Sequence, residues 1–303
     1  MKNLGLAALA CVLVLAGCGL GPGRERAGGA ELRVTRDFGH RLLAVERLDR
    51  VREDQTVMQF LRSRLRVKTS YGGRFVQAIG GLSGRGPSGG EDWFYFVNGI
   101  EAKVGAAEKV LSPGDLVQWD YRSWRAAMSV PAIVGAFPEP FRHGIEGRRL
   151  PVRLECERPS STPCRTVTSR LRAAGVGSSV AGLGASSGTE LIRVVVARWA
   201  RARRLAAVSA LEEPPGRSGV FARFGVRSTL ELLDPAGRPA RRAAPGTGVV
   251  AALAPPGTAL TWVVTGLDDR GVAAAARAID ARDLRDAYAV AATPSGVEKL
   301  PLP

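Results

Sequence analysis

The sequence predicts a mixed α+β protein with two folded domains behind an N-terminal leader and tether. Three observations predict this class. Polar and apolar residues alternate, as in half-buried strands, at several places between residues 31 and 121. A capped amphipathic helix follows the first of these strands. In residues 151–303, apolar runs rich in branched residues alternate with helical stretches, and this half of the chain is predicted to be an α/β domain.

The N-terminus has the features of a bacterial lipoprotein signal. Lys2 precedes an apolar run, Leu4 to Leu15, that is shorter than the roughly 20 residues of a membrane-spanning helix. It ends in Leu-Ala-Gly-Cys18, which resembles the signal in which the cysteine sulfur is acylated and becomes the new N-terminus. The alternative is an incidental or buried cysteine. We expect residues 1–18 to be a lipoprotein signal peptide ending at lipidated Cys18.

The Gly-rich, charged residues 19–30 are predicted to form a flexible tether. The mature protein would then sit on the extracytoplasmic face of the cell membrane, anchored by palmitate-type acyl chains.

The first domain is predicted over residues 31–124. Strands are expected at residues 31–35 and 42–45. A helix follows, because Thr56 and Gln59 have the spacing of a capping box. After a further strand near residues 75–79, the Gly-rich residues 83–90 are expected to be either flexible filler or a flap over a ligand.

A β-hairpin is predicted around Asn98-Gly99, because both central residues of a type I′ turn need a positive φ. The run before it, 93–97, places Trp93, Tyr95 and Val97 on one face of a strand and Phe94 and Phe96 on the other, and one of the two sets is expected to be core. A last alternating strand, 116–121, follows a Pro-Gly turn.

These motifs, in order, resemble the transcobalamin-like C-terminal domain family. The residues that carry the resemblance are Thr56 to Leu61, Gly80-Gly81-Leu82, Trp93 to Gly99, Gly105, Pro113-Gly114-Asp115, Trp119 and Tyr121. The resemblance implies a small α+β domain of β-grasp character, of a kind found on extracellular and lipid-anchored bacterial proteins. In transcobalamins this domain lies over one face of cobalamin while a helical barrel holds the other face. Nothing in this chain resembles the barrel.

If the first domain holds a corrinoid or another flat ligand, the ligand-binding residues are expected to be Tyr71, Trp93, Tyr95 and Trp119, which offer flat faces with polar tips. The alternative is that these rings are simply packed in a half-buried sheet.

A Pro-rich linker is expected at residues 125–150, extended and packed between two bodies. For the α/β domain at 151–303 the motifs point to no particular family. Strands are expected at 151–156, 191–197, 219–224, 230–233 and 260–266, and helices at 166–174 and 271–281. Asp268 or Asp269 is expected to cap the last helix, although the glycine at position 266 also allows an anion site there.

Cys156 and Cys164 are predicted to form a disulfide, because they flank a Pro- and Ser-rich loop and would lie outside the cytoplasm. Zinc is a poor alternative, since the chain has only two histidines, His40 and His143, and both are distant in sequence. We therefore expect no metal site.

The net charge of +15 falls to 15 − 1 = +14 when Lys2 is removed with the signal. Such a surface could attract anionic lipid or wall polymer, or the charge could simply be spread over solvated faces. A basic cluster at 198–204 is accompanied by no nucleic-acid-binding signature, so no nucleic-acid partner is expected.

No nucleophile motif, phosphate-binding loop or metalloprotease motif is present, and we expect no enzyme activity and no catalytic residues. The predicted function is that of an anchored lipoprotein with a non-catalytic ligand-binding role. It would bind a cobalamin-like corrinoid or other cofactor-like small molecule and hand it to a membrane transporter. The alternative is a cell-envelope scaffold that binds a protein or wall polymer.

Overall fold

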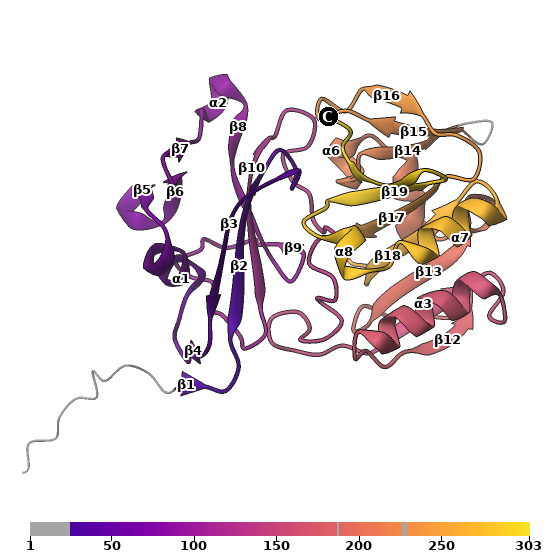
Figure 1. The fold of residues 1–303 in the computed structure, drawn as a ribbon, viewed down its shortest axis with the longest axis horizontal. Helices are drawn as coiled ribbons and strands as arrows, with labels where there is room; N and C mark the ends of the chain where they lie inside the picture. The colour runs from indigo at the N-terminus through magenta and orange to yellow at the C-terminus, as the bar shows by residue number, and fades with distance from the viewer. Residues whose placement is uncertain (1–24, 187, 226–228) are drawn as a thin grey trace, which may run out of the picture.

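Two β-sheets organise the chain, one in each half (Figure 1). The structure is a computed structural model that describes residues 25–186, 188–225 and 229–303. It contains both helices and strands, so the predicted mixed α+β class is confirmed.

The first sheet has five strands in the order β3-β2-β10-β8-β9. Their bounds are β2 Ala30–Arg36, β3 Arg41–Leu48, β8 Glu91–Val97, β9 Ile100–Glu101 and β10 Leu116–Ser123. The central pair, β2 and β10, is parallel, with Val34 opposite Trp119, and the other pairs are antiparallel. Asn98 and Gly99 have φ values of 53° and 78°, as the predicted turn between β8 and β9 requires.

A second layer covers the face of this sheet that is turned away from the second half of the chain (Figure 1). Its elements are α1 Val57–Arg64, β5 Val67–Ser70, the 3₁₀ turn η1 Tyr71–Gly73, β6 Phe75–Ile79, β7 Leu82–Ser83 and α2 Gly86–Gly89. Thr56 and Gln59 form the predicted capping box at the start of α1. Near it, β1 Glu25–Arg26 pairs with β4 Val51–Arg52, which fixes the start of the described chain beside this layer.

The second sheet has seven strands in the order β12-β11-β13-β18-β17-β19-β20. Their bounds are β11 Val152–Cys156, β12 Ser179–Gly182, β13 Ile192–Arg198, β17 Gly248–Leu253, β18 Leu260–Gly266, β19 Ala289–Thr293 and β20 Gly296–Leu300. Neighbouring strands from β12 to β18 in this order are parallel, and neighbouring strands from β18 to β20 are antiparallel.

Two helices cover one face of the second sheet, α3 Thr162–Ala173 and α7 Asp269–Arg277. The other face packs against the first half and against short elements. These are α4 Trp199–Ala202, α5 Ala206–Ser209, η2 Ala210–Glu212, α6 Pro215–Ser218, and the small sheet of β14 Ala222–Gly225, β15 Thr229–Leu233 and β16 Pro239–Arg242. The last helix, α8 Ala281–Leu284, precedes β19.

Several boundaries differ from the predictions. Helix α3 begins at Thr162 rather than at residue 166, because Ser161 caps it and its backbone turns within the disulfide loop. The predicted helix at 271–281 is instead α7 and α8, since Asp268 caps the first and Asp280 caps the second. Part of the Gly-rich segment 83–90 forms α2.

The segment between the two sheets is largely buried. Val130, Ala132, Ile133 and Val134 are each at most 3% exposed, and they pack into the two hydrophobic cores of the second half. The segment therefore packs as part of the fold.

Candidate functional site

The predicted lipidation residue, Cys18, lies outside the described residues. Within the described part of the chain, no helix is both long and apolar enough to cross a bilayer.

Three of the four predicted ligand-binding aromatic residues lie in the core between the first sheet and the second layer that covers it. Trp93, Tyr95 and Trp119 are 6%, 9% and 3% exposed. The rings of Tyr95 and Trp119 stack with their centroids 4.8 Å apart, and Trp93 packs edge-on against Tyr121. The polar tips of two of them are also engaged, because Trp93 Nε1 donates to the Leu82 carbonyl and Tyr95 Oη donates to the Val104 carbonyl. In this arrangement their flat faces meet other rings.

The fourth residue, Tyr71, is separated from the other three. It lies at the tip of the β5–β6 hairpin, is 85% exposed, and meets Phe75 edge-on at 6.4 Å. The structure therefore does not bring the four residues together on one open face.

The predicted disulfide is present. Cys156, at the end of β11, is bonded to Cys164 in the first turn of α3. Both residues are at most 1% exposed, so the disulfide is buried in the core and fixes the two ends of the loop between β11 and α3.

The opposite face of the first sheet is buried against the second half, and it carries polar side chains. Thr35, Gln118, Asp120 and Arg122 project from β2 and β10 and are each at most 1% exposed. Phe94 and Phe96 share this face, and Phe96 packs edge-on against Tyr288 of the second half. Both faces of strand β8 are therefore packed against other parts of the chain, whereas the sequence predicted that only one of them would be core.

Asp120 is the centre of this buried face. Its Oδ1 accepts hydrogen bonds from Thr35 Oγ1 at 2.7 Å and from the Gly39 amide at 3.1 Å, and its Oδ2 accepts one from Tyr288 Oη at 3.0 Å. Burial raises the pKa of Asp120 to about 6, against the opposing effect of these donors and of Arg122.

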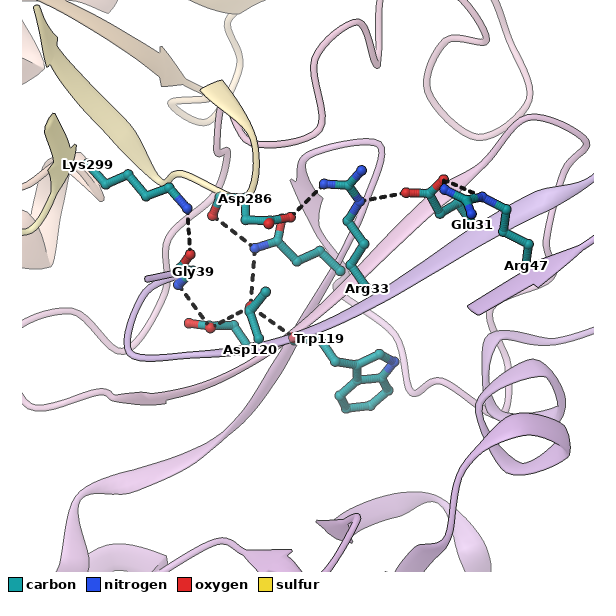
Figure 2. Close-up of polar contacts among 10 residues, drawn as sticks. Glu31, Arg33, Gly39, Arg47, Trp119, Asp120, Asp286 and Lys299 are labelled. Atoms are coloured by element: carbon teal, nitrogen blue, oxygen red, sulfur yellow. Dashed lines mark hydrogen bonds and ion pairs between the residues drawn. The ribbon is translucent and has the colours of Figure 1, made fainter. Parts of the chain in front are cut away.

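Asp286 makes the second group of contacts across the interface (Figure 2). Its carboxylate accepts from Arg33 Nη1 at 2.9 Å, and its backbone carbonyl accepts from Gln118 Nε2 at 3.1 Å. Lys299 donates to the Gly39 carbonyl at 2.8 Å, and burial lowers the pKa of its ammonium group. The hydrogen bonds of Asp120, Asp286 and Lys299 join the two halves. Two buried atoms of the same face, Gln118 Oε1 and Arg122 Nε, have no hydrogen-bond partner among the described residues.

A cavity of about 580 Å³ lies elsewhere, where the linking segment meets the ends of α3 and α8. We call it the seam cavity. Its lining consists of Phe137, Pro138, Arg142, His143, Arg149, Ala173, Ala174, Gly175 and Ala281. Its volume lies in the range typical of small-molecule sites, about 300–1,000 Å³. The cavity combines an aromatic and alanine surface with three nitrogen-bearing side chains.

The imidazole of His143 is held in place by a buried carboxylate. Glu139 is 5% exposed, and its Oε1 lies 2.7 Å from His143 Nδ1 while its Oε2 accepts from the His143 amide at 2.9 Å. Gly114 packs directly against the ring and leaves no room there for a Cβ. Nδ1 is thus engaged with Glu139, and Nε2 is the ring nitrogen left for a ligand.

The guanidinium groups of Arg142 and Arg149 are exposed at the same cavity. Neither group has a hydrogen bond or ion pair with another residue in the described ranges. Guanidinium forks bind carboxylates and phosphates in a bidentate manner. Together with an imidazole nitrogen, they make the seam cavity suited to an anion.

Sequence reasoning did not find this site. Its only local signal is the i,i+4 spacing of Glu139 and His143 in a chain with two histidines. The arginines meet Ala173 and Ala281 only through the tertiary fold. Among the described residues, no group of three or more His, Cys, Asp or Glu side chains is arranged to hold a metal ion.

Comparisons with known proteins find a family match for part of the first half. Residues 54–123 match the family described as a domain of unknown function, DUF4430. The matched residues run from just before α1 to the end of β10. A search of curated proteins found no match. Among solved structures, the chain is similar to a protein of Ruminococcus gnavus ATCC 29149 described as a "putative metal binding protein". The identity is 15% and the TM-score 0.27, and the match covers 32% of this chain and 97% of the other.

Proposed function

We propose that this protein is a lipid-anchored, extracytoplasmic binding protein that takes an anionic ligand in the seam cavity and does not transform it. The observation that carries the proposal is the convergence of Arg142, Arg149 and the carboxylate-held His143 on one cavity. The anchor rests on the sequence around Cys18.

The cavity favours a particular chemistry. Two guanidinium groups and Nε2 of His143 can contact several oxygens of one phosphate or carboxylate group, while Phe137 and the alanines contact an apolar part. Phosphate esters and phosphodiester polymers have this combination. A polymer segment would make the protein an envelope scaffold, and a free phosphate ester would make it a small-molecule carrier.

We also infer that the first half is a β-grasp domain of the transcobalamin-like kind. The support is its topology, in which a hairpin, a helix and a return to a strand parallel with the first build one mixed sheet. The packing of Trp93, Tyr95 and Trp119 favours the scaffold over a corrinoid carrier, because rings closed by other rings offer no face to a corrin.

The anchor can be tested in cells. Labelling with radioactive palmitate should mark the wild-type protein in the membrane fraction, and Cys18→Ala should abolish the label. An unlabelled wild-type protein in the cytosol would refute the anchor.

The ligand class can be tested by calorimetry on the chain from Gly19 to Pro303. Inorganic phosphate and glycerol phosphate polymer should both release or absorb heat on binding, with the polymer bound more tightly if it is the scaffold's ligand. Cobalamin, as a third titrant with a spectral readout, tests the corrinoid prediction.

A matched pair of variants distinguishes binding in the seam cavity from nonspecific attraction to exposed arginines. Arg142→Gln with Arg149→Gln should weaken phosphate binding on the order of 100-fold, since each charge-assisted contact contributes about tenfold. Arg148→Gln removes a neighbouring exposed arginine that pairs with Glu190, and it should leave binding within about twofold. Equal losses in both variants would contradict the site.

A further inference from the structure

The layer that covers the outer face of the first sheet has an unusual charge. From Gln55 to Gly90 the sequence contains no Asp or Glu. The same stretch carries six cations, Arg62, Arg64, Arg66, Lys68, Arg74 and Arg85. All six are exposed, and only Arg85 forms an ion pair, with Glu91, among the described residues. We call this surface, built on α1 and β5–β7, the outer layer.

Two aromatic side chains project from the same layer. Tyr71 is 85% exposed and Phe75 is 43% exposed, and their rings touch at the tip of the β5–β6 hairpin. Tyr71 also holds a left-handed backbone, with φ at 51°, a conformation that costs energy in a residue with a bulky side chain. Lys68 precedes Tyr71 by three residues, and Arg74 lies directly before Phe75.

The position of this layer relative to the chain start is fixed by β1. Glu25 and Arg26 pair with β4, and α1 begins five residues after Arg52. From Cys18 to Glu25 the chain has seven steps, which span at most about 25 Å when fully extended. An acyl chain on Cys18 would therefore keep this end of the molecule near the bilayer. The second half lies on the opposite face of the first sheet (Figure 1).

We propose that the outer layer docks on the surface of an anionic phospholipid bilayer, with Tyr71 and Phe75 at the headgroup level and the cations against lipid phosphates. The proposal rests on the anchor of the proposed function and extends it, because it assigns the face that meets the membrane. The positive charge of the outer layer favours anionic phospholipids. The exposed rings of Tyr71 and Phe75 favour the interface between headgroups and acyl chains.

The loop that packs beside α1 slightly modifies this charge. The amides of Val57 and Met58 donate to the carbonyls of Lys109 and Ala106, so residues 103–110 border the layer. The loop adds one exposed cation, Lys103, and one exposed carboxylate, Glu108, while Lys109 is ion-paired with Glu146. The surface therefore stays cationic.

The test is co-sedimentation of the chain from Gly19 to Pro303, which has no lipid of its own, with vesicles. It should bind vesicles of phosphatidylcholine mixed with phosphatidylglycerol and not vesicles of phosphatidylcholine alone, and added salt should weaken binding. Arg66→Gln, Lys68→Gln and Arg74→Gln combined should reduce the affinity on the order of 100-fold, at about fivefold for each cation. Tyr71→Ser with Phe75→Ser should reduce it on the order of tenfold.

The control removes the same charge from the second half. Arg204→Gln, Arg217→Gln and Arg242→Gln combined change exposed arginines there and should leave vesicle binding within about twofold. Equal loss in the two triple variants would overturn the proposal, because net charge alone would then account for binding. Near-ultraviolet circular dichroism checks that each variant is folded.

Two other outcomes would also overturn it. One is an absence of binding to anionic vesicles. The other is binding to a soluble phosphodiester polymer that needs the outer-layer cations but not Tyr71 or Phe75, which would make the layer a polymer site. Palmitate labelling of Cys18 and phosphate binding in the seam cavity are separate measurements, so failure here leaves the proposed function intact.

Discussion

The hydroxyl group of Tyr288 donates a hydrogen bond of 3.0 Å to Asp120 and joins the two halves of the chain through two fully buried side chains. Tyr288 lies just before β19 of the second sheet, and Asp120 lies on the central strand β10 of the first. A carboxylate in this position has lost its water and depends on Thr35, Gly39 and Tyr288 for its hydrogen bonds. The halves are thus connected by a polar contact that is costly to break.

Stability should fall as the pH rises through the titration of Asp120. Burial raises its pKa in the folded state to about 6, above the ordinary aspartate value of 3.8. The folded state therefore binds the proton more tightly, and its contribution to stability is fully present below about pH 4 and lost by about pH 6. The loss should be about 3 kcal/mol, at 1.36 kcal/mol for each pKa unit.

Asp120→Asn isolates this effect, because the amide does not titrate and nearly preserves the shape. Urea unfolding across this pH range should show wild-type stability falling relative to the variant. The exposed control Asp49→Asn should follow the wild-type curve. Parallel curves for wild type and Asp120→Asn would contradict the prediction.

A side chain at Gly39 should disrupt the contact between the halves. A Cβ there would overlap the carbonyl oxygen of Asp286, whereas a Cβ at Gly72 would meet open space. Both glycines have a left-handed backbone, with φ at 76° and 69°, so an alanine costs about 1–2 kcal/mol at either position. Gly39→Ala should cost about 1–3 kcal/mol more, from the overlap.

Unfolding free energies of the two variants measure this difference directly. Equal destabilisation by Gly39→Ala and Gly72→Ala would mean that the halves do not pack as closely as described.

Trp119 should act as a core residue. Trp119→Ala removes a ring stacked on Tyr95 and should lower the free energy of unfolding by about 3–5 kcal/mol. Tyr71→Ala, at an exposed position, should change it by less than about 0.5 kcal/mol. Chemical denaturation tests both, and a Trp119→Ala protein of wild-type stability would instead favour a ligand-facing role for this ring.

The disulfide should contribute about 2–3 kcal/mol, mainly by restricting the unfolded chain between Cys156 and Cys164. Cys156→Ala with Cys164→Ala should lower the urea midpoint accordingly. In the chain from Gly19 to Pro303 these are the only cysteines, so thiol titration of the denatured, unreduced protein should find none free. Free thiols in protein recovered from the envelope would show that the bond does not form there.

Sequence reasoning succeeded where local chemistry decides the structure. Thr56 and Gln59 cap α1 through their own side chains, and Asn98-Gly99 adopts the positive φ values that its turn needs. Strand β17, in contrast, was missed, although β18 is just as buried and was predicted. One glycine and two alanines among the six residues of β17 weaken its strand signal, since both residue types are depleted in strands.

The sites depended on tertiary contacts. The alternation of Gln118 and Asp120 with Trp119 marks a polar face, but the pattern cannot distinguish water from a polar interface with a second body. Likewise, Arg142 and Arg149 meet His143 and the end of α3 only after residues far apart in the chain have packed.

Anion binding in the seam cavity can be seen directly in a crystal structure of the chain from Gly19 to Pro303 soaked in arsenate, a phosphate mimic that scatters anomalously. We expect an anomalous peak in the seam cavity, within hydrogen-bonding distance of Arg142, Arg149 and Nε2 of His143, and its loss in the Arg142→Gln, Arg149→Gln variant. A wild-type crystal with an empty seam cavity, or a peak that the variant retains, would contradict this expectation.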